Sequence, residues 1–457
     1  MPEPTSDIVI LGGGSGGYAC ALRAAELGLS VTLIEQAELG GTCLHRGCIP
    51  TKALLHSAEV ADTAREGGAF GVRSSLEGID MPAVLKYKDG VVARLYKGLT
   101  GLVKSRGINF VAGTGKLTAT NTVTVDGTAY VGKHVVLATG SYAKSIPGLE
   151  ISGRIMTSDQ ALFYDQVPRS VVVLGGGVIG VEFASVWRSF GAKVTIIEAL
   201  PRLVAAEDEA CSKALERAFR KRGIEFKTNT KFVAAEQDAD SVTVTCADGS
   251  VVTADLLLVA VGRGPRTQDL GYEQAGVEMD RGFVLTNDHL QTNVENVYAV
   301  GDIVPGLQLA HRGFAQGIFV AEHIAGVNPR PIEESGIPRV TYCEPEVASV
   351  GLTEVQAKEK HGDEVVSYEY NLGGNGKSQI LATTGFVKLV ALKDGPVLGI
   401  HMVGARVGEL IGEGQLIVNW EADANDVASL IHAHPTQNEA LGEAHLALAG
   451  KPLHTHA

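Results

Sequence analysis

Two cysteines are the residues of this 457-residue chain whose type and spacing best suit chemistry. Cys43 and Cys48 are separated by four residues within the segment GGTCLHRGCIPTKALL, residues 40–55. Pro50 suits the first turn of a helix, so Cys48 is expected near a helix N-terminus, where the dipole favours a thiolate. Two buried structural cysteines would also fit this spacing. The glycine-rich flanks, which permit close backbone approach, favour redox use.

The elements that must position these cysteines come from a repeat. Residues 8–35, IVILGGGSGGYACALRAAELGLSVTLIE, align with residues 171–198, VVVLGGGVIGVEFASVWRSFGAKVTIIE, and 12 of the 28 positions are identical. Each segment shows an apolar strand, a glycine-rich turn, a helical stretch and a second apolar strand. Each is therefore predicted to form a βαβ unit of the kind that binds dinucleotides.

Both units carry the motif G-x-G-x-x-G and end in a glutamate: Gly12, Gly14, Gly17 and Glu35 in the first, and Gly175, Gly177, Gly180 and Glu198 in the second. The three glycines permit a tight turn, close approach of a pyrophosphate and close packing of helix on strand. The terminal carboxylate accepts hydrogen bonds from a ribose 2′-hydroxyl and repels a 2′-phosphate, so the second site is expected to prefer NAD to NADP. Arg202 lies close enough in sequence to weaken that preference. Two dinucleotide sites favour FAD paired with NAD.

Composition limits the remaining choices. Glycine is in excess, with 56 residues, and the net charge of −13 argues against nucleic acid or an anionic membrane as main partner. No apolar run approaches the roughly 18 residues of a membrane span, and no basic region precedes the first apolar stretch, as a signal peptide would require. Six cysteines make no disulfide scaffold, so a cytoplasmic protein is expected.

The sequence resembles the flavin disulfide reductases with a C-x4-C redox pair, nearly end to end from Ile8 to Leu453. The resemblance is closest to the members that oxidise dihydrolipoamide. It departs from the usual pattern at His45, Arg46, Thr51 and Asn438, and none of these changes removes a group that the chemistry needs. It rests on the cysteine segment and on ATGS at 138–141, VGRGPRT at 261–267, VYAVGDI at 297–303, PEVASVGLTE at 345–354 and HAHPTQNEALGEAH at 432–445.

The resemblance implies an α/β fold, with two Rossmann-like dinucleotide-binding domains and a C-terminal α+β dimerisation domain. Alternating apolar stretches and helix-like stretches in the last part fit a sheet covered by helices. The expected divisions are an FAD-binding domain at 1–146, an NAD-binding domain at 147–267, the second, central part of the FAD-binding domain at 268–335, and the dimerisation domain at 336–457.

The resemblance also assigns roles to single residues. Cys48 would be the flavin-facing sulfur and Cys43 the sulfur that meets substrate. Lys52 would reach flavin N5 and Glu182 would be its partner, although a solvated helix lysine and a surface acid are simpler alternatives. Further FAD contacts are implied for Gly41, Thr42, Gly115, Thr139, Gly140, Ser141, Asp302, Gln308, Leu309, Ala310 and His311, and further NAD contacts for Ile179 and Gly262.

His434 and Glu439 would supply the base. A thiol attacks a disulfide only as the thiolate, and a histidine with a carboxylate partner is a base poised near neutral pH. Glu439 would orient the imidazole and stabilise its charged form. His432 could be confused with this base. No metal site is expected, because no cysteine or acid cluster completes one around these histidines.

Together these roles imply oxidation of protein-bound dihydrolipoamide through a Cys43–Cys48 disulfide and FAD, with hydride passed to NAD. The implied assembly is a homodimer in which His434 and Glu439 face the cysteines of the other subunit. Its implied partners are the lipoyl domains of 2-oxo acid dehydrogenase acyltransferase subunits. Two alternatives stay open: a reductase of another disulfide, such as glutathione or mycothiol disulfide, and a non-catalytic structural subunit of an oxo-acid dehydrogenase assembly.

Overall fold

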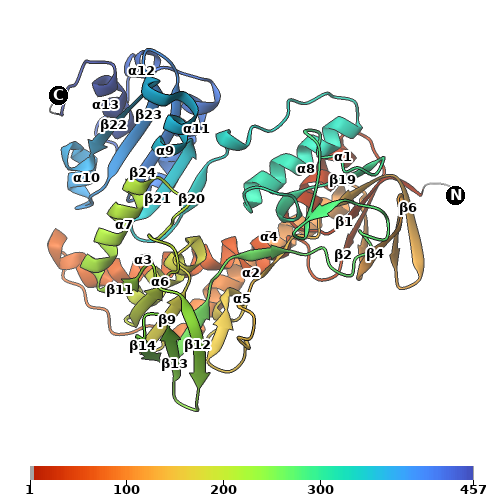
Figure 1. Ribbon diagram of the computed structural model, residues 1–457, viewed down its shortest axis with the longest axis horizontal. Coiled ribbons are helices and arrows are strands. Elements are labelled where there is room, and N and C mark those ends of the chain that lie inside the picture. Colours follow the sequence, from red (N-terminus) through yellow and green to blue (C-terminus); the bar gives the residue numbers. More distant parts are fainter. Residues whose placement is uncertain (1–4, 456–457) are drawn as a thin grey trace.

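The computed structural model describes residues 5–455, so the first and last residues of the expected terminal domains lie outside the described part. Figure 1 shows three bodies: an N-terminal body at the right, a second body at the lower left, and a C-terminal body at the upper left. No helix within residues 5–455 is long and apolar enough to cross a membrane.

The N-terminal body is built on the first repeat. Parallel strands run in the order β3-β2-β1-β6, with β19 also paired to β6, and β5 and β4 extend the sheet in antiparallel fashion. Helix α1 packs against α8, which comes from much later in the chain. The bounds are β1 Ser6–Leu11, α1 Ser15–Glu26, β2 Val31–Glu35, α2 Gly41–Arg46, α3 Cys48–Glu66, α4 Met81–Ser105, β3 Asn109–Ala112, β4 Gly115–Ala119, β5 Thr122–Val125, β6 Thr128–Leu137, β19 Val297–Ala299 and α8 Ala310–Ile324.

The second body is built on the second repeat, and its main sheet is wholly parallel, in the order β11-β10-β9-β15-β8. A three-stranded antiparallel sheet, β12-β13-β14, and the strand pair β7 with β16 accompany this sheet. A second pair, β17 with β18, follows in the chain and packs on the core of the N-terminal body through Met279 and Val284. The bounds are β7 Ser141–Ala143, β8 Ile155–Thr157, α5 Ser158–Ala161, β9 Ser170–Leu174, α6 Val178–Phe190, β10 Lys193–Ile197, α7 Glu209–Arg222, β11 Ile224–Lys227, β12 Phe232–Gln237, β13 Val242–Cys246, β14 Val251–Ala254, β15 Leu256–Val259, β16 Arg263–Pro265, β17 Met279–Asp280 and β18 Phe283–Val284.

The glycine motifs shape both turns in the same way. Gly12 and Gly175 have φ of 110° and 108°, a region that glycine adopts without a steric penalty. A Cβ atom on Gly17 would lie 1.8 Å from the Gly12 carbonyl oxygen, and one on Gly180 would lie 1.9 Å from the Gly175 oxygen. The helix can therefore approach the strand only if the third motif residue is glycine.

The C-terminal body is an antiparallel sheet in the order β20-β21-β24-β23-β22 with helices packed on it. Its core joins strand residues such as Leu389 and Ile400 to helix residues such as Ile411 and Leu441. The predicted fold class, including the sheet covered by helices, is confirmed. The bounds are β20 Arg339–Thr341, β21 Glu346–Gly351, α9 Glu354–His361, β22 Val365–Asn371, α10 Gly376–Ile380, β23 Phe386–Leu392, β24 Val397–Gly404, α11 Val407–Asn419, α12 Ala424–Ala428 and α13 Glu439–Leu448.

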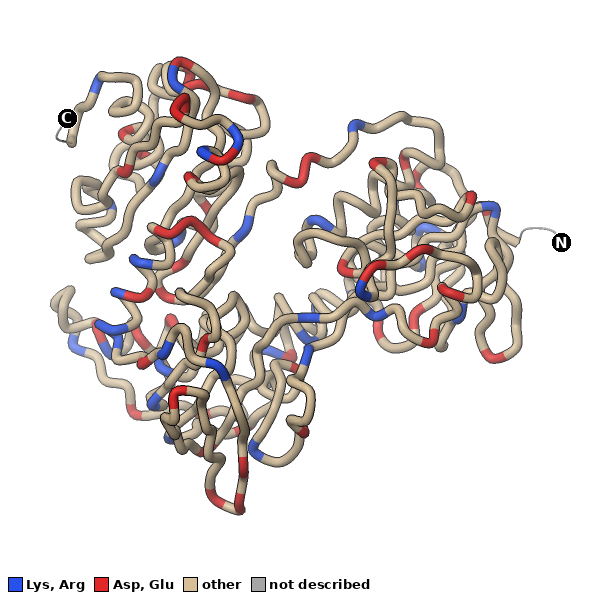
Figure 2. Tube along the Cα trace, in the orientation of Figure 1, with Lys and Arg blue, Asp and Glu red and all other residues tan. Residues whose placement is uncertain are grey.

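Charged side chains are spread over all three bodies. Figure 2 shows lysine and arginine interspersed with aspartate and glutamate along the chain. With a net charge of −13, this distribution offers little to a polyanionic partner.

Candidate active site

The two cysteines lie on consecutive helices rather than on one. Cys43 is in α2, Cys48 is the first residue of α3, and Gly47 between them has non-helical backbone angles. The expected helix start at Cys48 is confirmed, and the separate short helix that carries Cys43 is an addition. Both residues are half-buried free cysteines in this structure.

The surroundings make the two sulfurs unequal. The hydrogen bond from Cys43 and the charge of Lys52 lower the pKa of Cys48 against the effect of burial. The same hydrogen bond, together with burial, raises the pKa of Cys43. Cys48 is therefore the sulfur that ionises first, as a thiolate at a helix N-terminus should.

Lys52 and Glu182 form an ion pair between the first two bodies. Lys52 Nζ lies 2.9 Å from both carboxylate oxygens of Glu182, whose side chain is 3% exposed. Burial opposes the charge on Lys52, but the Glu182 carboxylate outweighs it and raises the pKa of Lys52. The backbone N–H of Tyr342 donates to Glu182 Oε1 at 2.9 Å, and the Tyr342 ring centroid lies 4.7 Å from Lys52 Nζ. Tyr342, from the C-terminal body, carried no sequence signal of its own.

The residues predicted to hold FAD gather around the first glycine turn. Glu35 accepts hydrogen bonds from the N–H groups of Gly13, at 2.6 Å, and Ala37, at 2.8 Å. A Cβ added to Gly14 would meet nothing nearer than the Gly41 Cα, at 3.9 Å, and one added to Gly140 would meet no atom within 4 Å. The turn thus leaves the open approach that a dinucleotide phosphate needs.

A hydrogen-bonded chain fixes Asp302, one of the residues implied to contact FAD. The Ser141 hydroxyl donates to Asp302 Oδ2 at 2.5 Å, and Arg263 Nε donates to the Ser141 hydroxyl at 2.8 Å. Thr139 donates its hydroxyl to the carbonyl oxygen of Arg266 at 2.6 Å. Sequence reasoning missed Arg263, although it stands inside the segment VGRGPRT.

Other predicted FAD contacts have clear places in the fold. Gln308 Nε2 donates to the Asp302 carbonyl at 3.3 Å, Leu309 is the N-cap residue of α8, and Ala310 is the first residue of that helix. His311 Nε2 lies 2.8 Å from the Pro338 carbonyl oxygen, so this ring is tied to the segment leading into the C-terminal body. The remaining positions are Gly115, packed between Leu11 and Val123, and Gly41 and Thr42, at the start of α2.

The second glycine turn repeats the first. Glu198 accepts from the N–H groups of Gly176 and Leu200, both at 2.6 Å. A Cβ added to Gly177 or Gly262 would meet no atom within 4 Å, and Ile179 lies in the first turn of α6. The Arg202 guanidinium donates to the carbonyls of Ala205, at 2.8 Å, and Glu207, at 3.0 Å. Arg202 is thus engaged within its own loop.

His434 and Glu439 form the expected pair. His434 Nδ1 lies 2.8 Å from Glu439 Oε1, and Glu439 Oε2 accepts from the Thr436 N–H at 2.7 Å. Although desolvation opposes the charge on Glu439, these two hydrogen bonds outweigh it and lower the pKa of Glu439. The His434 side chain is 76% exposed, which leaves its Nε2 edge accessible.

His432 has a different environment. Its Nε2 lies 2.8 Å from Glu413 Oε1, its side chain is only 11% exposed, and a Cβ on Gly442 would lie 2.5 Å from its Nδ1. The structure therefore separates a half-buried histidine that packs on α13 from an exposed one that is available as a base.

The cysteines and the histidine pair do not meet within one chain. Figure 1 places α13, which begins at Glu439, at the outer end of the C-terminal body, and α2 near the centre of the molecule. A site that uses both must draw on two chains.

Two dinucleotide-binding units, a thiol pair beside the first and a separate antiparallel domain define an oxidoreductase of the flavin disulfide class. Residues 6–317 match the family described as pyridine nucleotide-disulphide oxidoreductase, and residues 337–445 match the dimerisation domain of that family. The chain belongs to this family. Its cofactors are FAD and NAD, and the open glycine turns fit them.

Known relatives match over nearly the whole chain. The dihydrolipoyl dehydrogenase of Bacillus subtilis (strain 168) is 40% identical, covering 98% of this chain and 99% of that protein. The mitochondrial dihydrolipoyl dehydrogenase 1 of Arabidopsis thaliana is 41% identical, covering 98% and 91%. Among solved structures, LpdA from Mycobacterium tuberculosis superposes with a TM-score of 0.91 at 26% identity, covering 96% of this chain and 99% of that one.

Proposed function

We propose that this enzyme oxidises protein-bound dihydrolipoamide and passes the electrons through FAD to NAD. The observation that carries the proposal is the exposed His434–Glu439 pair on the dimerisation domain, remote from the chain's own Cys43 and Cys48. Such a base suits a substrate that arrives as a thiol at a subunit boundary. The names of the relatives favour a lipoyl dithiol as that substrate.

The cysteine pair carries the exchange. His434 of one subunit takes a proton from a substrate thiol, and the thiolate attacks the Cys43 sulfur of the partner, so that the Cys43–Cys48 disulfide breaks and Cys48 leaves as a thiolate. The second substrate thiol then attacks the substrate sulfur bound to Cys43, which closes the lipoyl ring and releases Cys43. The two electrons of the substrate now reside in the reduced cysteine pair.

When bound, FAD would supply the electron sink between the reduced cysteine pair and NAD. Lys52, paired with Glu182, places positive charge beside the Cys48 thiolate. We assign the first glycine unit and Asp302 to FAD, and the second unit, with Glu198 as ribose acid, to NAD. The division into domains at 146, 267 and 335 belongs to the same proposal.

The proposed assembly is a homodimer that serves lipoyl domains of 2-oxo acid dehydrogenase complexes. The match to a dimerisation domain supports the dimer, and the relatives' names support the lipoyl partner. A cytoplasmic location is part of the proposal, since six cysteines form no disulfide scaffold.

One set of assays separates this function from the alternatives. NAD reduction is measured with a dihydrolipoyl domain, beside NADH and NADPH oxidation with glutathione and mycothiol disulfides. The proposal expects turnover with the lipoyl domain and a preference for NAD. Turnover with another disulfide alone would overturn the substrate assignment, and no turnover with any of them would favour a structural subunit.

A further inference from the structure

The loop between Glu198 and α7, residues 199–208, joins the second glycine turn to the C-terminal body. At its near end, Leu200 N–H binds the Glu198 carboxylate at 2.6 Å and Val204 N–H binds the Gly176 carbonyl at 2.8 Å. The same loop therefore holds both the acid and the glycine turn that we assign to NAD.

Val204 marks a strained point in this loop. It is buried and β-branched, yet its φ is +44°, a left-handed conformation that such residues rarely adopt. A residue stays in a costly conformation only where its surroundings constrain it. Within the loop, this conformation is held by the hydrogen bond to Gly176, by the Glu207 N–H bound to the Val204 carbonyl at 2.8 Å, and by the Arg202 guanidinium on the Glu207 carbonyl at 3.0 Å. Two of these contacts end on Glu207, so the conformation also depends on how the far end of the loop is fixed.

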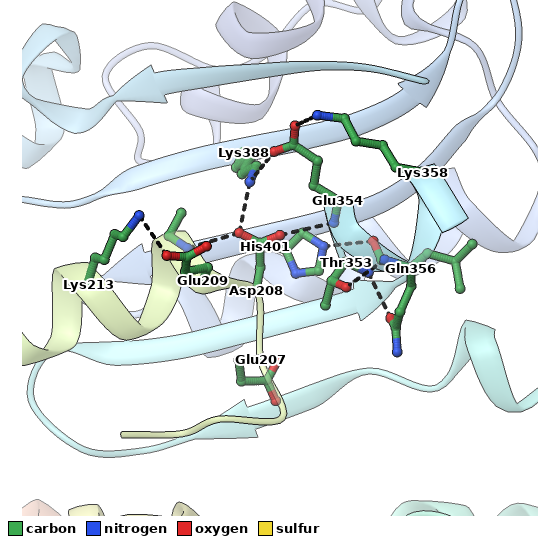
Figure 3. A network of polar contacts seen from close by, with 12 residues as sticks. Glu207, Asp208, Glu209, Lys213, Thr353, Glu354, Gln356, Lys358, Lys388 and His401 are labelled. Atoms are coloured by element: carbon green, nitrogen blue, oxygen red, sulfur yellow. Dashed lines mark hydrogen bonds and ion pairs between the residues drawn. The ribbon is translucent and has the colours of Figure 1, made fainter. Parts of the chain in front are cut away.

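The far end is fixed by buried charge. Asp208 and Glu207 are 2% and 5% exposed, and both face cations of the C-terminal body. Lys388 Nζ, from β23, lies 2.8 Å from Asp208 Oδ1, and Arg339 Nε, from β20, lies 3.1 Å from Glu207 Oε1. Figure 3 shows Lys388 between Asp208 and Glu354, with Glu207 on the other side of the same segment.

The Asp208 carboxylate is saturated with donors. It accepts from Lys388, from the Glu354 N–H at 3.0 Å and from the Ala210 N–H at 3.0 Å, the last as N-cap of α7. Although burial opposes its charge, these donors lower the pKa of Asp208 to about 2. A buried acid with this many partners is costly to free, because a lone charge would remain inside the protein.

We propose that Lys388–Asp208 and Arg339–Glu207 form a latch that holds loop 199–208 in the shape the NAD site requires. Asp208 and Lys388 are then positioning residues, and the dimerisation domain helps to set the affinity for NAD. The inference rests on the proposed function only in that the second βαβ unit binds NAD.

The test replaces Lys388 with methionine in the FAD-loaded full-length enzyme and measures NAD binding by titration calorimetry. We expect the dissociation constant to rise by about fivefold or more, the usual lower range of coupling between separate sites. Amide hydrogen exchange at Val204 should quicken, whereas reduction of the enzyme by dihydrolipoamide should keep its wild-type rate.

Lys358→Met is the matched control. Lys358 also pairs with Glu354, at 2.6 Å, but it lies on the surface and has no contact with Asp208, so NAD binding should not change. If Lys388→Met fails to fold, the double variant D208N/K388M removes both charges. The single change Asp208→Asn is avoided, because it would leave the Lys388 ammonium without its main partner. Asparagine still caps a helix, so the double variant should fold and bind NAD as weakly.

Two results would overturn the latch. One is a folded Lys388→Met or double variant with wild-type NAD affinity and wild-type protection at Val204. The other is an equal fall in NAD affinity and in the rate of reduction by dihydrolipoamide, which would indicate general structural damage. Calorimetry needs no lipoyl substrate, so it tests the latch whatever the substrate is. A wild-type enzyme that binds NAD but does not oxidise dihydrolipoamide would contradict the proposed substrate, and the NAD affinities of the variants would still decide on the latch.

Discussion

Glu35 is the last residue of β2 and Glu198 directly follows β10, and both accept a 2.6 Å hydrogen bond from the glycine turn of their own βαβ unit. In both units the loop beyond the glutamate then returns to that turn. Gly40 N–H binds the Gly13 carbonyl at 2.9 Å, and Val204 N–H binds the Gly176 carbonyl at 2.8 Å.

Beyond this shared point the two loops diverge. The first enters α2 and α3, which carry Cys43 and Cys48, while the second runs to Glu207 and Asp208 and their cations on the C-terminal body. One exit loop thus leads to the cysteine pair, and the other leads to buried ion pairs with the C-terminal body. The difference teaches that a duplicated unit can keep its binding turn while its exit loop takes a new role.

The largest effect should come from the reactive exit loop. Cys48→Ser removes the sulfur that leaves as a thiolate, so dithiol oxidation should fall to background in a steady-state assay of NAD reduction. NAD binding, measured by calorimetry, should be unchanged, because the second unit is untouched. Contact between the Cys48 thiolate and the flavin should give the reduced wild-type enzyme a long-wavelength absorption band. A Cys48→Ser enzyme that still oxidised dihydrolipoamide, or kept this band on reduction, would contradict the assignment of Cys48 as the flavin-facing sulfur.

An alanine at the third glycine of the motif should cost each unit its own cofactor. A Cβ at Gly17 or Gly180 would lie within 2 Å of a carbonyl oxygen, so helix and strand must separate. Gly17→Ala should yield protein that lacks FAD, and Gly180→Ala should yield yellow protein that binds NAD poorly. Gly98→Ala, in α4 with open space around it, is the control and should keep both cofactors. A Gly180→Ala protein that lacks FAD would contradict the assignment of FAD to the first unit and NAD to the second.

Glu198→Gln should have a smaller effect, confined to the second unit. Hydrogen bonds to charged groups contribute about 1.5–3 kcal/mol, so NAD should bind roughly tenfold more weakly or worse. NADPH should be discriminated against less, because the repelling charge is gone. Binding of both nucleotides by calorimetry checks this, and an unchanged NAD to NADP ratio would show that the carboxylate does not select the cofactor.

The smallest effect concerns pH. Lys52 helps to hold the pKa of Cys48 below its ordinary value, and the thiolate therefore persists to lower pH. In Lys52→Met the pKa should rise, so the long-wavelength band of the reduced enzyme should appear only at higher pH. Lys97→Met, exposed on α4, should leave the midpoint unchanged. A midpoint that stays or falls in Lys52→Met would contradict the electrostatic role of Lys52.

The sequence was informative wherever local geometry demands a residue type. Gly17 and Gly180 are the clearest cases, because no larger side chain fits, and the repeat of such positions revealed both units. The start of α3 at Cys48 could be predicted from Pro50.

Contacts between distant segments left no such signal. Lys388 and Asp208 are 180 residues apart, and nothing in either neighbourhood shows that they meet. Tyr342 reaches Glu182 through its backbone N–H, and Arg263 reaches Ser141 through its guanidinium. Neither contact could be predicted from the residues that surround these positions in the sequence. Tertiary packing decides these contacts, and only the structure reveals them.

A two-chain active site is the central claim, and a mixed dimer tests it most directly. Subunits carrying Cys48→Ser and subunits carrying His434→Gln are co-expressed with different tags, and the heterodimer is isolated. Each parent homodimer should be nearly inactive, whereas the heterodimer should regain about half of the wild-type turnover with dihydrolipoamide, because one of its two sites combines an intact cysteine pair with an intact histidine. A heterodimer as inactive as its parents would contradict the account.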